Sequence, residues 1–222
     1  QFELGDDGGV RREEGVAGDR VAVAVLDADR AELAHPAVDF DVVALAASDR
    51  SAGRTYREAV AWRCATPIPA WAATMMVDEA KPNAVKADIV FSALDASVAE
   101  DIEVAFAEAG SAVVSNARNH RMDVDVPLLV PEVNSTHVSL ISTQRRKRGW
   151  IKGCIVTNPN CSSAGLVCAL KPIHDRFEVR RVSVTTMQAI SGAGYPGVSA
   201  ADIHDNVIPF ISGEEEKLEI EP

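Results

Sequence analysis

The chain has 222 residues, of which 47% are hydrophobic and 25% are charged, enough for one large domain or two modest ones with a buried core. Its formal net charge of -11 disfavours nonspecific binding to nucleic acid. No apolar run reaches the roughly 18 residues that a membrane helix needs. We therefore expect neither a nucleic-acid nor a membrane partner. Residues 1–19 are acidic and rich in glycine, which predicts a disordered N-terminus rather than a signal or transit peptide.

Alternating strands and helices are predicted for the first two thirds of the chain. Short apolar runs predict strands at residues 20–26, 40–47, 85–94, 112–115 and 126–130. Helical spacing of apolar residues predicts a helix over residues 98–109, which Gly110 ends. Residues 27–34 predict at most a short helical turn, and residues 55–80 predict loops with a weak strand. This order favours an α/β domain with a mostly parallel sheet.

Ligands of such domains bind beyond the carboxyl ends of the strands. Polar side chains stand at four predicted strand ends: Ser48, Ser92, Asn116 and Asn134. The basic run at residues 145–148 predicts a solvated turn, with a targeting or polyanion-binding patch as the alternative.

The four cysteines have neither CxxC spacing nor paired histidines; they are Cys64, Cys154, Cys161 and Cys168. This pattern disfavours a zinc site and a disulfide framework. We therefore expect no metal and a reducing, cytoplasmic location.

One cysteine stands out within the sequence TNPNCSSAG at residues 157–165. Cys161 follows an Asn-Pro-Asn turn and precedes a predicted helix over residues 162–170. A thiol in the first turn of a helix faces unpaired backbone N–H groups and the positive end of the helix dipole, which favour the nucleophilic thiolate. The alternative is a small core cysteine, since cysteine is often buried. The turn and the small polar neighbours favour a nucleophile.

A second domain is predicted to begin at Cys161. Residues 178–190 alternate like a half-exposed antiparallel strand, followed by a glycine-rich turn at 191–198, a helix over 199–206 and a charged segment at 213–217. The expected domains are residues 1–19 as the disordered N-terminus, 20–160 as the nucleotide-binding domain and 161–222 as a partial second domain.

The glycine-rich turn contains a literal GxGxxG motif formed by Gly192, Gly194 and Gly197. Pro196 removes a backbone N–H from a loop that would have to present such groups to a pyrophosphate. We interpret the turn as a surface that a flat ligand approaches closely, with a purely structural turn as the alternative. The usual place for a phosphate loop is after the first strand, where residues 26–30 contain two acids and no glycine.

Five segments in order resemble the archaeal and fungal type of aspartate-β-semialdehyde dehydrogenase. They are ALAASDRSAG (44–53), VFSAL (90–94), SNARNHRMDVDVPLLVPEVN (115–134), RGWIKGCIVTNPNCSSAG (148–165) and MQAISGAGYPGVSAADIHDNVIPFISGEEEKLE (187–219). The resemblance implies a Rossmann-like NADP-binding domain followed by the first part of an α+β substrate-binding and dimerisation domain. It also implies a homodimer or homotetramer that acts on aspartate semialdehyde or β-aspartyl phosphate.

The same resemblance implies roles for individual residues. Cys161 is the nucleophile that forms a thioester, and Gln188 orients its carbonyl. Asn116, Arg121 and Lys217 bind phosphate, and Glu214 receives the substrate's α-ammonium group. For NADP, Ser48, Arg50 and Ser51 match the turn at the adenosine ribose and its 2′-phosphate, and Ser92, Asn160, Ser191 and Gly192 match the nicotinamide side.

Each role has a simpler alternative. Arg50 and Arg121 can be ordinary surface charges, Glu214 and Lys217 a helical i,i+3 pair, and Gln188 a solvent-facing strand residue.

Two departures from the family predict low activity for this chain alone. The family's GxTGxVG loop is missing between residues 26 and 35. The family's general-base histidine, which follows a glycine, and its substrate-carboxylate arginine are also missing. None of the five histidines, His35, His120, His137, His174 and His204, follows a glycine, and we would test His204 first. The alternatives are a non-catalytic dimerising remnant of the fold and another acyl-phosphate reductase, such as N-acetylglutamyl-phosphate reductase.

Overall fold

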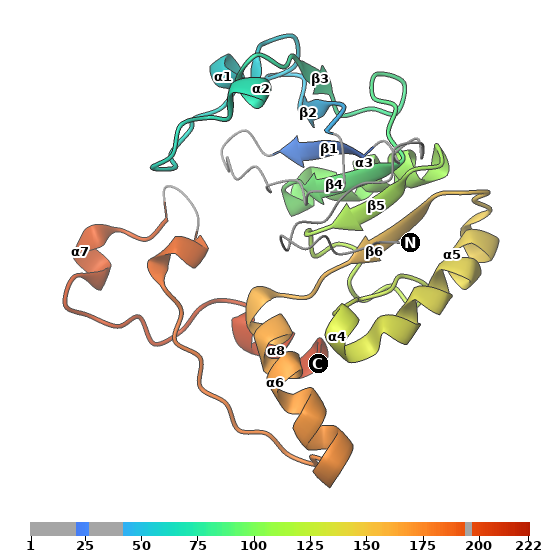
Figure 1. Cartoon of the computed structure of the whole chain (residues 1–222). Coiled ribbons are helices and arrows are strands. Elements are labelled where there is room, and N and C mark those ends of the chain that lie inside the picture. The colour runs from blue at the N-terminus through green and yellow to red at the C-terminus, as the bar shows by residue number, and fades with distance from the viewer. Residues whose placement is uncertain (1–20, 27–41, 194–196) are drawn as a thin grey trace, which may run out of the picture.

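The computed structural model describes residues 21–26, 42–193 and 197–222, and these contain one six-stranded parallel sheet (Figure 1). Its spatial order is β3 (Val77–Glu79), β2 (Leu45–Ala47), β1 (Val21–Leu26), β4 (Ile89–Ala93), β5 (Ala112–Ser115) and β6 (Cys154–Thr157). The order reverses between β1 and β4, as in a Rossmann fold, where ligands bind at that point. The predicted α/β class and parallel sheet are confirmed.

The strand register brings polar residues together at the carboxyl edge of the sheet. Val25 is paired with Ser92, Ser92 with Ser115, and Ser115 with Thr157. The residues that follow β5 and β6, beginning with Asn116 and Asn158, therefore leave the sheet side by side.

Helix α3 (Ala96–Glu108) covers the centre of the sheet. The Asp95 side chain accepts a hydrogen bond from the Ser97 N–H at its start, and Gly110, with φ of 103°, follows its end. Phe106 and Ala107 of this helix belong to the main hydrophobic cluster, together with Val90, Val113 and Ile155 of three neighbouring strands. The helix predicted over residues 98–109 is confirmed.

The remaining helices follow the sheet edges and the C-terminal third. Helices α1 (Tyr56–Ala59) and α2 (Ala70–Ala73) lie near β2 and β3, and α4 (Pro131–Asn134), η1 (Ser135–Ser139) and α5 (Leu140–Arg148) lead into β6. Beyond β6 lie α6 (Cys161–Phe177), η2 (Ile190–Ala193), α7 (Ala200–Ile203) and α8 (Glu214–Ile220). In the described part of the chain, none of these helices has the length and apolarity to cross a membrane.

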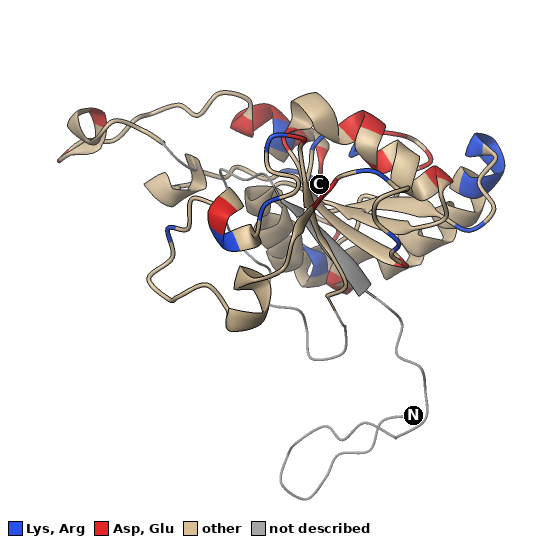
Figure 2. Cartoon of the chain, turned by 90° about the horizontal axis from the view of Figure 1, so that it is seen from above, with Lys and Arg blue, Asp and Glu red and all other residues tan. Residues whose placement is uncertain are grey.

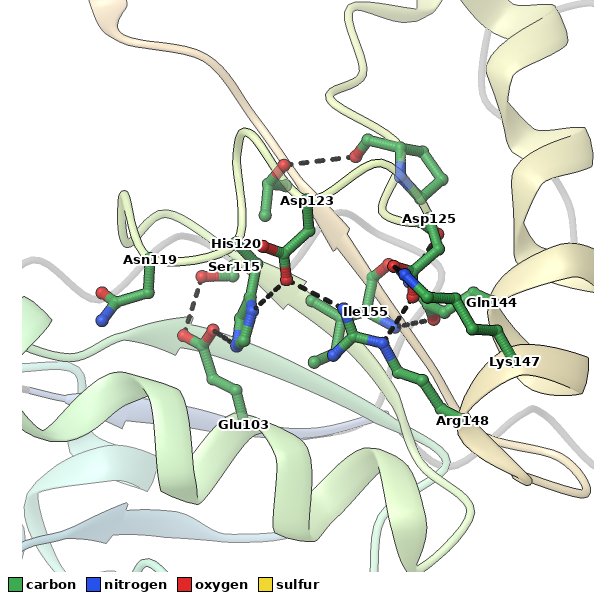
Figure 3. Close-up of polar contacts among 12 residues, drawn as sticks. Glu103, Ser115, Asn119, His120, Asp123, Asp125, Gln144, Lys147, Arg148 and Ile155 are labelled. Carbon is green, nitrogen blue, oxygen red and sulfur yellow. Dashed lines mark hydrogen bonds and ion pairs between the residues drawn. The ribbon is translucent and has the colours of Figure 1, made fainter.

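A buried polar network links α3 to α5 through the segment between them (Figure 3). Glu103, 1% exposed, faces the His120 Nε2 atom at 3.9 Å, and His120 Nδ1 lies 3.0 Å from Asp123. Arg148 donates to both Asp123 and Asp125. Burial alone would raise the pKa of Asp125, but hydrogen bonds from Arg148 and Lys147 hold it below its ordinary value.

The basic run at residues 145–148 forms the last turn of helix α5 and not a loop. Arg146 and Lys147 are exposed, as predicted, but Lys147 and Arg148 are also paired with Asp125. Figure 2 shows this basic turn at one edge of the molecule. Gly149, with φ of 73°, ends the helix.

Two predicted strands are absent from the structure. Residues 126–130 form only an isolated parallel bridge between Leu128 and Thr157, because Pro127 lies within this short segment and Pro131 follows it. Residues 178–189 form no strand, since they extend away from the sheet and no described strand lies beside them to supply hydrogen bonds.

Several predicted boundaries were wrong. The helix predicted over 162–170 begins at Cys161 and continues through Pro172 to Phe177, and the helix predicted over 199–206 is only the short α7. The loops predicted over 55–80 contain α1 and α2, whereas the weak strand predicted there is β3. Strand β2 is shorter than the predicted 40–47, and β4 shorter than 85–94. The disordered N-terminus, the turn at 27–34 and the missing phosphate loop lie outside the described residues.

Candidate active site

Cys161 is the first residue of α6 and its side chain is exposed. The preceding residue, Asn160, caps the helix, because its side-chain oxygen accepts a hydrogen bond of 2.9 Å from the Ser162 N–H. The other cysteine nearby in sequence, Cys154, lies buried in β6, and burial raises the pKa of its thiol. Cys168 is exposed farther along α6. The thiol at the helix start is thus accessible and positioned by its cap.

Three side chains from distant segments meet at this helix start. The Gln188 side-chain N–H donates to the Ser162 hydroxyl at 3.1 Å and to the Glu214 carboxylate at 3.0 Å. The same carboxylate accepts hydrogen bonds from Asn160 at 3.2 Å and Lys217 at 2.6 Å. The Lys217 ammonium group lowers the pKa of Glu214, and Gln188 and Asn160 add to the effect against partial burial. Glu214 and Lys217 do form an i,i+3 pair, but they form it within the site.

Arg121 and Asn116 join the group from the carboxyl edge of the sheet. Asn116 follows β5, and its side-chain oxygen accepts a hydrogen bond of 2.9 Å from Asn158. Arg121 donates to the Asn116 carbonyl and to the Glu221 carboxylate, each at 3.0 Å. The other Glu221 oxygen accepts the Asn160 backbone N–H at 2.7 Å. Arg121 is therefore a buried member of a network and not an ordinary surface charge.

The structure thus groups Cys161 with Asn116, Arg121, Asn160, Gln188, Glu214 and Lys217. It adds three residues that the sequence did not indicate: Asn158, Ser162 and Glu221. The spacing of Glu221, seven residues after Glu214, places the two residues on one face of a helix, but nothing in the sequence indicates its contact with Arg121.

The residues expected at the cofactor are divided between two places. Ser48, Arg50 and Ser51 form the turn after β2, where Ser51 is buried and the Arg50 side chain is exposed. No hydrogen bond among the described residues joins this turn to the Cys161 group. Gly192 lies beside Gln188, since a Cβ on Gly192 would be 3.5 Å from the Gln188 side-chain oxygen.

Ser191 is exposed in the same 3₁₀ turn as Gly192. Ser92, in contrast, is buried: its hydroxyl donates to Glu103 and its carbonyl accepts a hydrogen bond of 2.9 Å from the Asn116 N–H.

The histidines that the structure describes have other partners or lie apart from Cys161. His120 is buried against Glu103 and Asp123, His137 lies 3.0 Å from the Asn134 side chain, and His174 and His204 are exposed. His35 lies outside the described residues. Within those residues, no three or more His, Cys, Asp or Glu side chains are grouped to hold a metal ion.

Comparison with protein families gives two matches. Residues 31–141 match the family described as semialdehyde dehydrogenase, NAD binding domain, and residues 170–222 match semialdehyde dehydrogenase, dimerisation domain.

Curated relatives and solved structures agree with these matches. Over 82% of its length the chain is 51% identical to an aspartate-semialdehyde dehydrogenase of Archaeoglobus fulgidus, and over 84% it is 49% identical to that of Candida albicans, covering 53% of each relative. The chain thus spans about half the length of these relatives. A crystal structure of the Candida albicans enzyme with NADP superposes with a TM-score of 0.77 at 43% identity, covering 91% of this chain and 59% of that one.

These similarities cover most of the chain, and they agree with an exposed cysteine at a capped helix start beside a parallel sheet of Rossmann order. The chain belongs to the semialdehyde dehydrogenase family, on its aspartate-semialdehyde dehydrogenase branch.

Proposed function

We propose that this chain carries the nucleophile of an NADP-dependent aspartate-semialdehyde dehydrogenase. Such an enzyme reduces β-aspartyl phosphate to aspartate semialdehyde, a step towards lysine, threonine and methionine. The observation that supports the proposal is the exposed Cys161 at the start of α6, beside Gln188, Glu214 and Lys217. Within the matched family, the relatives named above favour this activity over the reduction of N-acetylglutamyl phosphate.

The Cys161 sulfur attacks the acyl carbon of β-aspartyl phosphate. The bond from that carbon to the phosphate oxygen breaks, phosphate leaves with the electron pair, and a thioester remains. Gln188 is close enough to the helix start to orient the thioester carbonyl, and the Ser162 hydroxyl holds its carboxamide. Asn160, Ser191 and Gly192 would hold the nicotinamide end of NADPH, which would supply hydride to the thioester carbon. The Cys161 sulfur would then leave with the electron pair of the broken carbon–sulfur bond, and the aldehyde would be released.

The charged residues of the site fit the charged groups of the substrate. The guanidinium of Arg121 and the ammonium of Lys217 are the cations suited to the leaving phosphate, and Asn116 adds an amide beside Arg121. Glu214, like an ordinary glutamate, is ionised at neutral pH, and its contact with Lys217 lowers its pKa further, so it can accept the α-ammonium group.

NADP fits the polar turn after β2 and the reversal of strand order between β1 and β4. The exposed Arg50, flanked by Ser48 and Ser51, suits a ribose 2′-phosphate, and this favours NADP over NAD. Asn160, Ser191 and Gly192 are the residues available to the nicotinamide side, whereas Ser92 is bonded within the protein through its hydroxyl and its carbonyl. The corresponding domain division is residues 20–160 for the cofactor and 161–222 for substrate and dimerisation.

A homodimer or homotetramer is the proposed assembly, in the cytoplasm. Apolar side chains are exposed along the region that matches the dimerisation domain, among them Val182, Val184, Met187 and Phe210. These exposed side chains also favour the second candidate function, a non-catalytic protein that associates through this surface. A chain that dimerises in sedimentation experiments but forms no thioester would support that second candidate.

The acylation half-reaction tests the proposal without requiring turnover. After incubation with β-aspartyl phosphate, peptide mass spectrometry should find a thioester on Cys161 and none on Cys168, which is exposed on the same helix. Cys161→Ser should abolish the adduct and Cys168→Ser should not. Equal acylation of the two cysteines would contradict the proposal.

The expectation of low activity is tested in the reverse direction, with aspartate semialdehyde, phosphate and NADP. We expect NADPH formation far below that of the Candida albicans relative, since no described histidine shares the hydrogen bonds of the Cys161 group and general acid–base help contributes roughly 10²–10⁴ in rate. Turnover within about tenfold of the relative would contradict this expectation and point to a base within the chain, with His204→Ala as the first variant to test.

A further inference from the structure

Glu221 is the one carboxylate at the site to which neither the mechanism nor the sequence gives a role. Its side chain is 4% exposed, although Glu221 is the C-cap residue of α8 and is followed directly by Pro222. Its two oxygens have different partners, the Arg121 Nη1 atom at 3.0 Å and the Asn160 backbone N–H at 2.7 Å. This carboxylate therefore joins the arginine to the residue that precedes Cys161.

Helix α8 contacts Asn160 from both of its ends. Glu214, at its first turn, accepts a hydrogen bond from the Asn160 side chain, and Glu221, seven residues later on the same face, accepts one from the Asn160 backbone. Arg121, in turn, is 9% exposed and is held from two sides by Glu221 and the Asn116 carbonyl. A buried guanidinium held in this way has its direction fixed before any ligand arrives.

The two contacts leave part of the guanidinium free for an anion. Nη1 and Nη2 each carry two hydrogens, and each uses one on the protein, so one N–H on each remains. We infer that Glu221 is a positioning residue for anion binding: it orients the Arg121 guanidinium beside the start of α6, so that the phosphate group next to Cys161 is bound. The inference rests on the proposed phosphate role of Arg121.

The chemistry of the contact predicts which substitutions fail. A carboxylate accepts hydrogen bonds at both oxygens, whereas the carboxamide of Glu221→Gln has one acceptor and must turn its NH₂ group towards a donor. Glu221→Gln therefore loses either Arg121 or the Asn160 N–H, although it matches glutamate in size. Glu221→Asp keeps two acceptor oxygens on a shorter side chain.

The test measures how inorganic phosphate protects Cys161 from iodoacetate in the whole chain. Peptide mass spectrometry gives the alkylation rate of Cys161, with exposed Cys168 as an internal reference. Glu221→Gln should raise the half-protecting phosphate concentration about tenfold. Glu221→Asp should raise it less. Glu219→Gln, which removes the same charge from an exposed position of α8, should leave it within about twofold.

A double-substitution cycle separates positioning from a general effect on folding. If Glu221 acts through Arg121, then Arg121→Lys with Glu221→Gln should weaken protection no more than Arg121→Lys alone. Additive losses, or a Glu221→Gln variant with altered melting temperature but unchanged phosphate protection, would overturn the inference while leaving the phosphate site intact. If phosphate gave no protection even to the unsubstituted chain, the proposed phosphate site would fail and the inference with it.

Discussion

The side chain of Asn160 contacts the carboxylate of Glu214, which lies 54 residues later in the chain, at 3.2 Å. The same Asn160 caps α6 through the Ser162 N–H. The start of α6 and the first turn of α8 are therefore joined through Asn160. A substitution at Glu214 should for this reason also weaken the N-terminal cap of α6.

Glu214→Gln should destabilise the chain in a pH-dependent way. The folded protein lowers the pKa of Glu214, so the carboxylate stabilises the fold above the ordinary glutamate pKa of about 4.3 and loses this effect as the pH falls through the lowered value. We expect a loss of roughly 1 kcal/mol at pH 7 that disappears in acid. Urea unfolding of both proteins across this range measures it.

The matched control is Glu215→Gln, the next residue along α8, whose side chain is exposed. It should change the unfolding free energy by less than about 0.5 kcal/mol at every pH. If Glu215→Gln and Glu214→Gln gave the same pH profile, the effect would come from net charge and not from the contacts with Asn160.

The sequence predicted the parts of the fold that depend on local or strongly buried patterns. Strand β5 has the predicted bounds, residues 112–115, because its first three residues are apolar and a parallel strand lies on each side of it. Residues 178–190 alternate in polarity, but alternation shows only which face of a strand would be buried, and a strand also needs a neighbour. The helix predicted to end at Leu170 continues through Pro172 to Phe177, which the usual helix-breaking effect of an interior proline does not predict.

The candidate site also has one part that the sequence predicted and one part that it did not. The position of Cys161 between the Asn-Pro-Asn turn and a helix is local, so the sequence alone predicted it, whereas the capping role of Asn160 came from the structure. The meeting of Gln188 and Glu214 with that helix start depends on the path of the chain, and only the resemblance to a family pointed to it. Glu221 contacts Arg121 across 100 residues of sequence, and no local pattern signals such a contact.

Glu103→Ala should be among the most destabilising substitutions in the cofactor domain. Glu103 accepts hydrogen bonds from the Ser92 and Ser115 hydroxyls and faces His120, all buried. Its removal leaves these groups unpaired beside a cavity, which should cost about 3–5 kcal/mol. Urea unfolding is the measurement, and Glu108→Ala, an exposed position of the same helix, is the control. Equal effects of the two substitutions would mean that the network contributes nothing.

Two glycines should respond in opposite ways to the same substitution. A Cβ on Gly153 would lie 1.7 Å from the Ala107 carbonyl oxygen, so Gly153→Ala must push α3 away from β6 and should cost roughly 3 kcal/mol or more. Gly165 lies within α6 with open space around its Cβ position, so Gly165→Ala should gain up to about 1 kcal/mol of helix stability. Thermal unfolding of the two variants compares them, and a stable Gly153→Ala protein would contradict the close contact.

Tyr56→Phe should make the free energy of unfolding less sensitive to alkaline pH. Burial, with a smaller effect of Cys64, raises the pKa of Tyr56 from its ordinary value of 10.0 to about 12. Between these values the unfolded chain releases the phenolic proton and the folded chain keeps it, so stability falls as the pH rises through this window. The buried hydroxyl has no hydrogen-bond partner among the described residues, so phenylalanine should cost less than about 0.5 kcal/mol at pH 8.

Unfolding of both proteins at pH 9 and at pH 11 measures the difference, and the comparison cancels the contribution of lysines that titrate in the same range. The variant should lose less stability between these values than the unsubstituted chain. A parallel fall in both proteins would show that Tyr56 ionises as readily in the folded state as in the unfolded chain, and would contradict its burial against β2.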